Sequence, residues 1–237
     1  MKQLNTANMN NLKILGTSHI AKQSIEEIKR AVEEFQPDIM AVELDRQRAI
    51  ALMQQHQSKM SFRDIAKIGV KGYAFVKIGH YVQQKLGKVV GVSPGAEMKT
   101  ALEIANLKKL QVALIDQPIN ITLKNFSKEL TWKEKGRFAT DLLKGLFFPK
   151  KQMEKYGMEE FDLRKVPEQQ VIAKIISQMK KQYPSIYKTI ISDRDKYMVK
   201  QLVKIMREHP EKKILAVVGA GHREGMEKLL LKVDIVR

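Results

Sequence analysis

The sequence predicts an α/β fold, with a mostly parallel central sheet flanked by helices and a helical insertion in the middle. Two observations lead to this class of fold. Short apolar runs of strand length recur along the chain, and segments with helical periodicity separate them. Strands and helices in alternation are typical of βαβ units, in which consecutive strands lie parallel.

A polar tail, residues 1–11, precedes the first predicted strand at residues 12–15. That apolar run is too short to form one face of a helix. Ser24 and Glu27 then have the spacing of a capping box, so we expect a helix to begin at Ser24. An apolar stripe with helical spacing follows, and Pro37 ends it.

The second strand is predicted at residues 38–44, and Asp45 is positioned to cap the helix after it. Residues 58–86 are rich in apolar side chains without a sharp period, and lysine or arginine recurs there every four residues. One helical face would therefore be strongly basic. We interpret it as a solvated face, while docking on a membrane surface or a partner stays open.

The remainder of the chain continues the alternation. Strands are predicted at residues 111–118 and 212–222, and helices at 131–148, 187–208 and 224–231. A turn at Pro94 and Gly95 opens another helix, and residues 149–165 are expected to be a mobile excursion. The sequence contains neither a solenoid-length repeat nor a linker, so residues 12–237 are predicted to form a single domain.

Composition limits the classes of function. The 237 residues carry a net charge of +17 and include no cysteine, which excludes disulfides and thiolate metal sites and fits a cytoplasmic protein. The excess of basic residues suggests an anionic partner, for example an anionic membrane surface. Nucleic acid is disfavoured because only 6% of residues are aromatic and no recognition motif is present. No signal peptide or transmembrane segment is predicted, and a homodimer formed through the apolar middle helices stays open.

Two stretches far apart in the chain end alike. "LKILGTSHI" at 12–20 and "ILAVVGAGH" at 214–222 each place Gly-x-x-His after an apolar run, so His19 and His222 follow strands. Glu43 and Asp116 lie at the ends of the second and third predicted strands. Ligands of open parallel sheets bind beyond the carboxyl ends of the strands. If these strands are neighbours, two imidazoles and two carboxylates meet there, as is typical of a site for manganese, iron, cobalt or zinc.

Two further charged residues attract attention by their position. Arg194 lies within the apolar stripe of the predicted helix 187–208, so its guanidinium faces inward and needs a carboxylate or an anionic ligand. Glu97 lies in the first turn of its predicted helix. Its side chain could turn inward or toward solvent, and the spacing does not decide between these orientations.

Several motifs resemble the TraB family of peptide-pheromone shutdown proteins, which includes PrgY. They are "LGTSHIAKQSIEEIKRAVEEFQPDIMAVELDRQR", "PGAEMKTALEIA", "LIDQPINITL", "ISDRDKYMVKQL" and "VVGAGHREGMEKLL", which occur in the order of that family. The family is related to the Tiki metalloproteases and, more distantly, to the erythromycin-esterase (EreA) and ChaN-like folds. The resemblance covers most of residues 12–232.

The resemblance implies a metal-dependent, peptidase-like hydrolase that acts on a peptide or small molecule and uses manganese or cobalt, with zinc or iron as further options. It implies His19, Glu43 and His222 as the metal ligands. The candidate catalytic residues that match the family's polar positions are Glu43, Arg48, Glu97, Asp116, Arg194 and Asp195, with Thr122 beside them.

The role of each candidate stays open at this point. Glu43 is a ligand or the general base, and Glu97 or Asp116 is the general base or a further ligand. An arginine would steady an oxyanion or a substrate carboxylate. Gln117 stands where the family pattern leads us to expect arginine. Many relatives continue into membrane-spanning helices, so membrane association also stays open. The alternative function is capture of a peptide or small ligand without turnover, as a regulator of signalling.

Overall fold

A computed structural model of the protein describes residues 10–17, 22–53, 95–147 and 169–235. The basic segment 58–86, the excursion 149–165 and His19 lie outside these ranges. Predictions about them therefore stay predictions.

The core of the fold is a parallel sheet of four strands in the order β1-β4-β2-β3. The strands are β1 (Leu12–Thr17), β2 (Ile39–Val42), β3 (Gln111–Leu114) and β4 (Ile214–Gly219). β4 pairs with both β1 and β2, and all three pairings are parallel. The predicted α/β fold with a parallel central sheet is confirmed.

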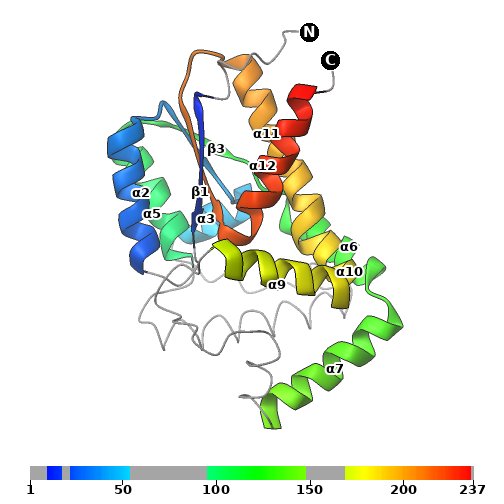
Figure 1. Cartoon of the computed structure of the whole chain (residues 1–237). Helices are drawn as coiled ribbons and strands as arrows, with labels where there is room; N and C mark the ends of the chain where they lie inside the picture. Colours follow the sequence, from blue (N-terminus) through cyan, green and yellow to red (C-terminus); the bar gives the residue numbers. More distant parts are fainter. Residues whose placement is uncertain (1–9, 18–21, 54–94, 148–168, 236–237) are drawn as a thin grey trace.

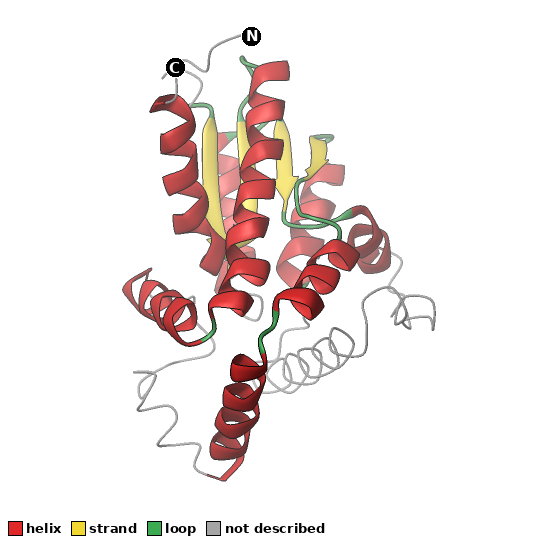
Figure 2. Cartoon of the chain, turned by 90° about the vertical axis from the view of Figure 1, so that its right-hand side faces the viewer, coloured by secondary structure: helices red, strands yellow, loops and turns green. Residues whose placement is uncertain are grey.

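Helices cover both faces of the sheet, as Figures 1 and 2 show. One face is covered by α2 (Lys22–Phe35) and α5 (Ala96–Leu107), and the other by α11 (Asp193–Glu208) and α12 (Ala220–Ile235). Right-handed crossovers explain this division. The chain moves across the sheet in one direction from β1 to β3 and returns from β3 to β4, so the connecting helices lie on opposite faces.

Side chains along the strands alternate between two apolar cores. In β2, Met40 and Val42 pack with α2 and α5, whereas Ile39 and Ala41 pack with α11 and α12. All four are fully buried. Burial of each large aliphatic side chain contributes about 1.5–3 kcal/mol to the stability of the fold. The two cores therefore hold the ends of the strands, and the residues that follow each strand, at fixed positions.

The remaining described helices lie near the carboxyl edge of the sheet or beyond it. They are α3 (Arg46–Met53), α6 (Ile119–Glu129), α7 (Trp132–Phe147), α9 (Gln169–Gln182) and α10 (Pro184–Tyr187). In both views α7 extends away from the sheet. Within the described part of the chain, no helix has the length and apolar character that a bilayer crossing requires.

Several predicted boundaries were wrong. α2 begins at Lys22, so Ser24 lies inside its first turn and is buried there, two residues after the start of the helix. α12 begins at Ala220, four residues before the predicted start, because the chain turns into a helix directly after β4. The helices α6 and α9 were not predicted. The long helix expected at 187–208 is present, but residues 188–192 form a π-helical segment.

Candidate functional site

Four charged or polar side chains from distant parts of the chain meet at the carboxyl edge of the sheet. Glu43 directly follows β2, Asp116 lies two residues beyond β3, and His222 is in the first turn of α12. Their exposed fractions are 4%, 3% and 4%. Arg194 enters from the first turn of α11, and its side chain is 13% exposed. The strands that carry these residues are neighbours, as the sequence interpretation required.

Glu43 is fixed by the pleat of β2 and by the end of β4. Ile39 and Ala41 face α11, and strand alternation places Glu43 on the same face. Its backbone N–H donates to the carbonyl oxygen of Val217 (3.0 Å), and its Oε2 accepts the backbone N–H of Gly219 (2.6 Å). The other carboxylate oxygen therefore points toward α11.

Arg194 binds two carboxylates at once. Its Nε and NH2 groups form a fork on Asp116, at 3.0 Å from Oδ1 and 2.7 Å from Oδ2, and NH2 also donates to Glu43. NH1 lies 3.0 Å from Nε2 of His222 and donates to the carbonyl oxygen of Ile190 (3.2 Å). Burial lowers the pKa of Arg194, but the two carboxylates outweigh it and raise the pKa above its ordinary value. The prediction that this guanidinium faces inward and pairs with a carboxylate is confirmed.

The two nitrogens of the His222 ring face different neighbours. Nδ1 lies 2.6 Å from Oδ1 of Asp195, a carboxylate that accepts, while Nε2 faces Arg194, which can only donate. A hydrogen on Nδ1 and a lone pair on Nε2 satisfy both of these neighbours, and Oε1 of Glu43 also lies 3.3 Å from Nε2. Burial raises the pKa of Asp195, and the hydrogen bond from His222 offsets only part of that rise.

Gly225 gives Asp195 the space to reach His222. α11 and α12 approach closely here, and a Cβ atom at Gly225 would overlap Oδ2 of Asp195. The spacing of His222 and Gly225, one helical turn apart, is visible in the sequence. Its meaning depends on a contact between two helices, which no local pattern reveals.

Asp45 also organises the site, although the sequence analysis assigned it only a capping role. Its Oδ1 accepts the backbone N–H groups of Gln47 (2.8 Å) and Arg48 (3.0 Å), which confirms the predicted cap on α3. Its Oδ2 accepts from Nε of Arg48 (2.8 Å) and from the backbone N–H of Ile119 (3.2 Å). Arg48 then donates to Asp116 through NH2. A second carboxylate two residues after Glu43 was the signal that could have identified this role.

The other predicted residues are placed less directly. The side-chain amide of Gln117 donates to Oγ1 of Thr122 (2.9 Å), and both residues are buried. Glu97 is buried in the first turn of α5, which covers the face of the sheet opposite α11. His19 lies outside the described residues, so its role as a ligand stays a prediction.

Glu43 and His222 have the chemistry of metal ligands, but Arg194 contacts both. Oε1 of Glu43 and Nε2 of His222 are 3.3 Å apart, and each faces the guanidinium. The described residues include no group of three or more His, Asp or Glu side chains placed to hold a metal ion. A carboxylate on the other nitrogen of a ligand histidine is nonetheless typical of metal centres, and Asp195 provides one.

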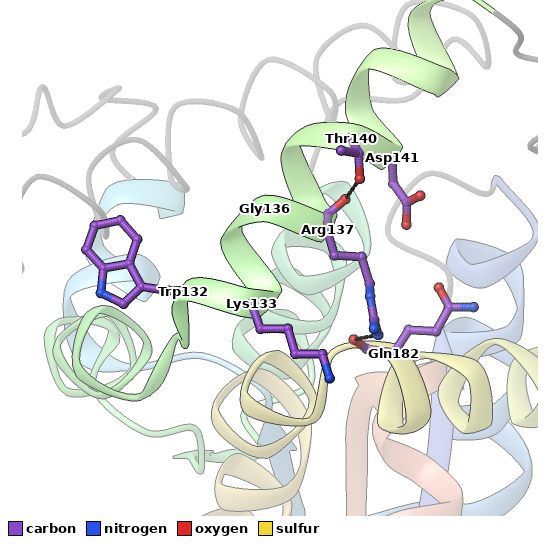
Figure 3. Close-up of a pocket in the computed structure, with 7 residues that line it drawn as sticks. All are labelled: Trp132, Lys133, Gly136, Arg137, Thr140, Asp141 and Gln182. Atoms are coloured by element: carbon purple, nitrogen blue, oxygen red, sulfur yellow. Dashed lines mark hydrogen bonds between the residues drawn. The ribbon is translucent and has the colours of Figure 1, made fainter.

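A groove of about 610 Å³ lies beside α7, and none of the predicted site residues lines it. Arg137 donates to the carbonyl oxygen of Gln182 (2.7 Å) at the end of α9, and Figure 3 shows Lys133 extending in the same direction. Trp132 is 82% exposed and points away from them. The groove contains nothing like the buried ionic network, and we assign it no function.

Fold and site together define an α/β protein with a buried ionic centre at the carboxyl edge of a parallel sheet. The chain belongs to the TraB/PrgY/gumN family, whose sequence model matches residues 4–233. The resemblance seen in the sequence motifs is thereby confirmed.

Relatives occur in archaea and in mammals. The chain is 32% identical over 236 residues to an uncharacterised protein of Methanocaldococcus jannaschii, with 99% of this chain and 57% of that protein covered. The TraB domain-containing proteins of Homo sapiens and Mus musculus are each 24% identical over 243 residues, with 91% of this chain and 61% of each relative covered. The chain therefore spans less than two thirds of the length of these relatives.

Proposed function

We propose that the protein is a metal-dependent hydrolase that acts on a peptide or a small molecule. The observation that carries this proposal is the pairing of a buried carboxylate with a buried imidazole. Oε1 of Glu43 lies 3.3 Å from Nε2 of His222, at the edge of the sheet where ligands of this fold bind.

The charges of the network support a cation at this position. Among its described members, four carboxylates (Glu43, Asp45, Asp116 and Asp195) face two guanidiniums, those of Arg48 and Arg194. Four negative and two positive charges leave an excess of two negative charges among these side chains. Burial of uncompensated charge is costly, so an added divalent cation would be stabilised here.

Glu43 and His222 would hold the cation, with His19 as the third ligand that the sequence predicts. Carboxylate and imidazole ligands suit manganese, cobalt, zinc and iron. When bound, the cation would lower the pKa of a water molecule toward ~7 and polarise a scissile carbonyl group. Side chains of the protein would orient the ligands of the cation and stabilise the charge that develops on the substrate.

His222 would keep the orientation that Asp195 gives it, because the bond to Nδ1 fixes both the ring and its tautomer. Arg194 would donate N–H groups to the negative charge that develops on the carbonyl oxygen. Asp116 would keep that arginine in place, since it forms the fork with Nε and NH2. Arg48 contacts the same carboxylate from α3 and supports its position.

The alternative function is capture of a peptide or small ligand without turnover. One observation favours it, because the carboxylates and guanidiniums of the network already satisfy one another in the described arrangement. A capturing protein needs no cation. Dependence of ligand binding on a chelator therefore separates the two functions.

Equilibrium dialysis against Mn²⁺, on protein purified without a histidine tag, tests the proposal. We expect about one equivalent of Mn²⁺ in the parent protein and loss of binding in His222→Ala. His209→Ala is the matched control, because His209 lies at the other end of α11. Binding that survives His222→Ala, or no binding of Mn²⁺, Co²⁺ or Zn²⁺ by the folded parent, contradicts the proposal. A peptide-cleavage screen with the loaded protein follows a positive result.

A further inference from the structure

Arg194 contacts the two atoms that a metal ion would need. Its NH2 group donates to Oε1 of Glu43, and its NH1 group lies 3.0 Å from Nε2 of His222. A lone pair that accepts a hydrogen bond from a guanidinium is not available for coordination. A cation beside the guanidinium would also be repelled by it.

We infer that Arg194 is an internal counter-cation that competes with a metal ion for Glu43 and His222. Occupation by the metal ion and release of the guanidinium from these two side chains are then one event. The inference rests on the proposed function, because it concerns the same site and names a way in which metal occupancy is regulated.

The geometry allows this release without loss of the whole ion pair. Arg194 binds Asp116 through Nε at 3.0 Å and through NH2 at 2.7 Å. NH2 also donates to Glu43, and the contact with His222 uses NH1, so only the bond from Nε is independent of the two contacts that are released. A rotation that moves the guanidinium away from His222 and Glu43 can keep the bond from Nε to Asp116. Asp116 is also bound by Arg48, so it stays in position while Arg194 moves.

Release of Arg194 from Glu43 and His222 would also allow its guanidinium to bind the substrate. Its side chain is 13% exposed, so the guanidinium lies close to solvent and can turn toward it. The N–H groups that leave Glu43 and His222 then become available to an oxygen of the substrate. Metal loading and the readiness of a cationic donor for substrate are coupled through one side chain.

Competition lowers the apparent affinity for the metal ion. The protein binds the ion only in the fraction of molecules in which the guanidinium has left, and the measured Kd rises by the reciprocal of that fraction. A variant without the guanidinium does not incur this cost. We therefore expect tighter metal binding in Arg194→Gln, by about tenfold or more.

The experiment measures the Kd of Mn²⁺ for the full chain by the electron paramagnetic resonance of free Mn²⁺. Parent, Arg194→Gln, Arg194→Lys and His222→Ala are compared, and circular dichroism verifies that each is folded. The expected order of affinity is Arg194→Gln above the parent, with Arg194→Lys between them, because lysine keeps the charge but cannot contact Glu43 and His222 together. If Arg194→Gln does not fold, the comparison of Arg194→Lys with the parent decides.

The outcomes separate the inference from the proposed function. If the parent binds Mn²⁺ through His222 and neither arginine variant binds it more tightly, the inference is wrong and the proposed function stands. If no variant binds Mn²⁺, or if binding survives His222→Ala, both are wrong. Tighter binding in the arginine variants together with its loss in His222→Ala supports both.

Discussion

The two ends of α11 bury side chains of different chemical character, apolar at one end and charged at the other. Its C-terminal part packs Met198, Leu202 and Met206 into the apolar core against β2 and β4. Its first turn instead buries Arg194 and Asp195, each bonded to charged or polar groups of other elements. Buried ion pairs are often no more stabilising than apolar residues of the same size, so stability alone does not account for the charged end.

The largest effect is expected from removing the cation of the charged end. Arg194→Ala leaves Glu43 and Asp116 without their shared partner, which costs about 3–5 kcal/mol of unfolding free energy. Urea denaturation in a chelating buffer measures it. Arg207→Ala, an exposed arginine in the last turn of the same helix, is the control and should change little. Equal effects of the two substitutions would show that the two ends do not differ as described.

Removing a side chain from the apolar end is expected to have a slightly smaller effect. Leu202 is fully buried, and Leu202→Ala should cost about 3 kcal/mol because it leaves a cavity. The Kd of Mn²⁺ should stay as in the parent, since the loss lies in packing between α11 and the sheet. A folded Leu202→Ala protein with altered metal affinity would show that the two ends are coupled.

An intermediate effect is expected where α12 touches the charged end. Gly225→Ala forces Asp195 away from its position and should cost about 1–3 kcal/mol through overpacking. Because Asp195 then holds His222 less well, the NMR chemical shifts of the His222 ring should change as well. Gly136→Ala is the control, since a Cβ there meets nothing within 4 Å. Unchanged chemical shifts of the His222 ring in Gly225→Ala would contradict the proposed contact.

The smallest effect is expected at Glu134, on α7 and outside the network. Burial raises the pKa of Glu134, but hydrogen bonds from Ser185 and Thr131 outweigh it and lower the pKa below its ordinary value of 4.5. The unfolded state therefore binds the proton more readily, so the contribution of Glu134 is complete above its ordinary pKa. It is lost as the pH falls through the lowered pKa of the folded state.

Glu134→Gln should thus cost about 1 kcal/mol at neutral pH, the usual size of a lost helix cap, and less in acid. Thermal unfolding of parent and variant between about pH 6 and pH 3 measures this difference, and the two curves should converge at the acidic end. A gap that stays constant over this range would exclude a titrating role for Glu134.

Much of the fold could be predicted because it depends on local patterns. The apolar runs marked all four strands, the cap at Asp45 was visible, and Arg194 was expected to face inward. The order of the strands could not be predicted, because periodicity says which face of a strand is buried and not which strand lies beside it. The starts of α2 and α12 were missed for a related reason, since packing against the sheet determines where the chain first becomes helical.

The sequence predicted which residues belong to the site better than it predicted the hydrogen bonds between them. Residues at strand ends were found by position alone, whereas the resemblance to a family supplied Arg48 and Asp195. The bond between Asp195 and His222, and the space left by Gly225, depend on how two helices cross. The π-helical segment before α11 has no sequence signature that we recognise, yet its residue Ile190 accepts a bond from Arg194.

The position of β4 has a consequence for how the chain is made. β4 is the last strand in the sequence, but it lies between β1 and β2, which do not pair with each other. Among the described strands only β4 pairs with β1, so this pairing cannot form on the ribosome until residues 214–219 have been synthesised. His222 follows immediately after them. Assembly of the ionic centre must therefore wait for this late strand, so a nascent chain carries Glu43 and Arg194 for some time without the imidazole that completes their surroundings.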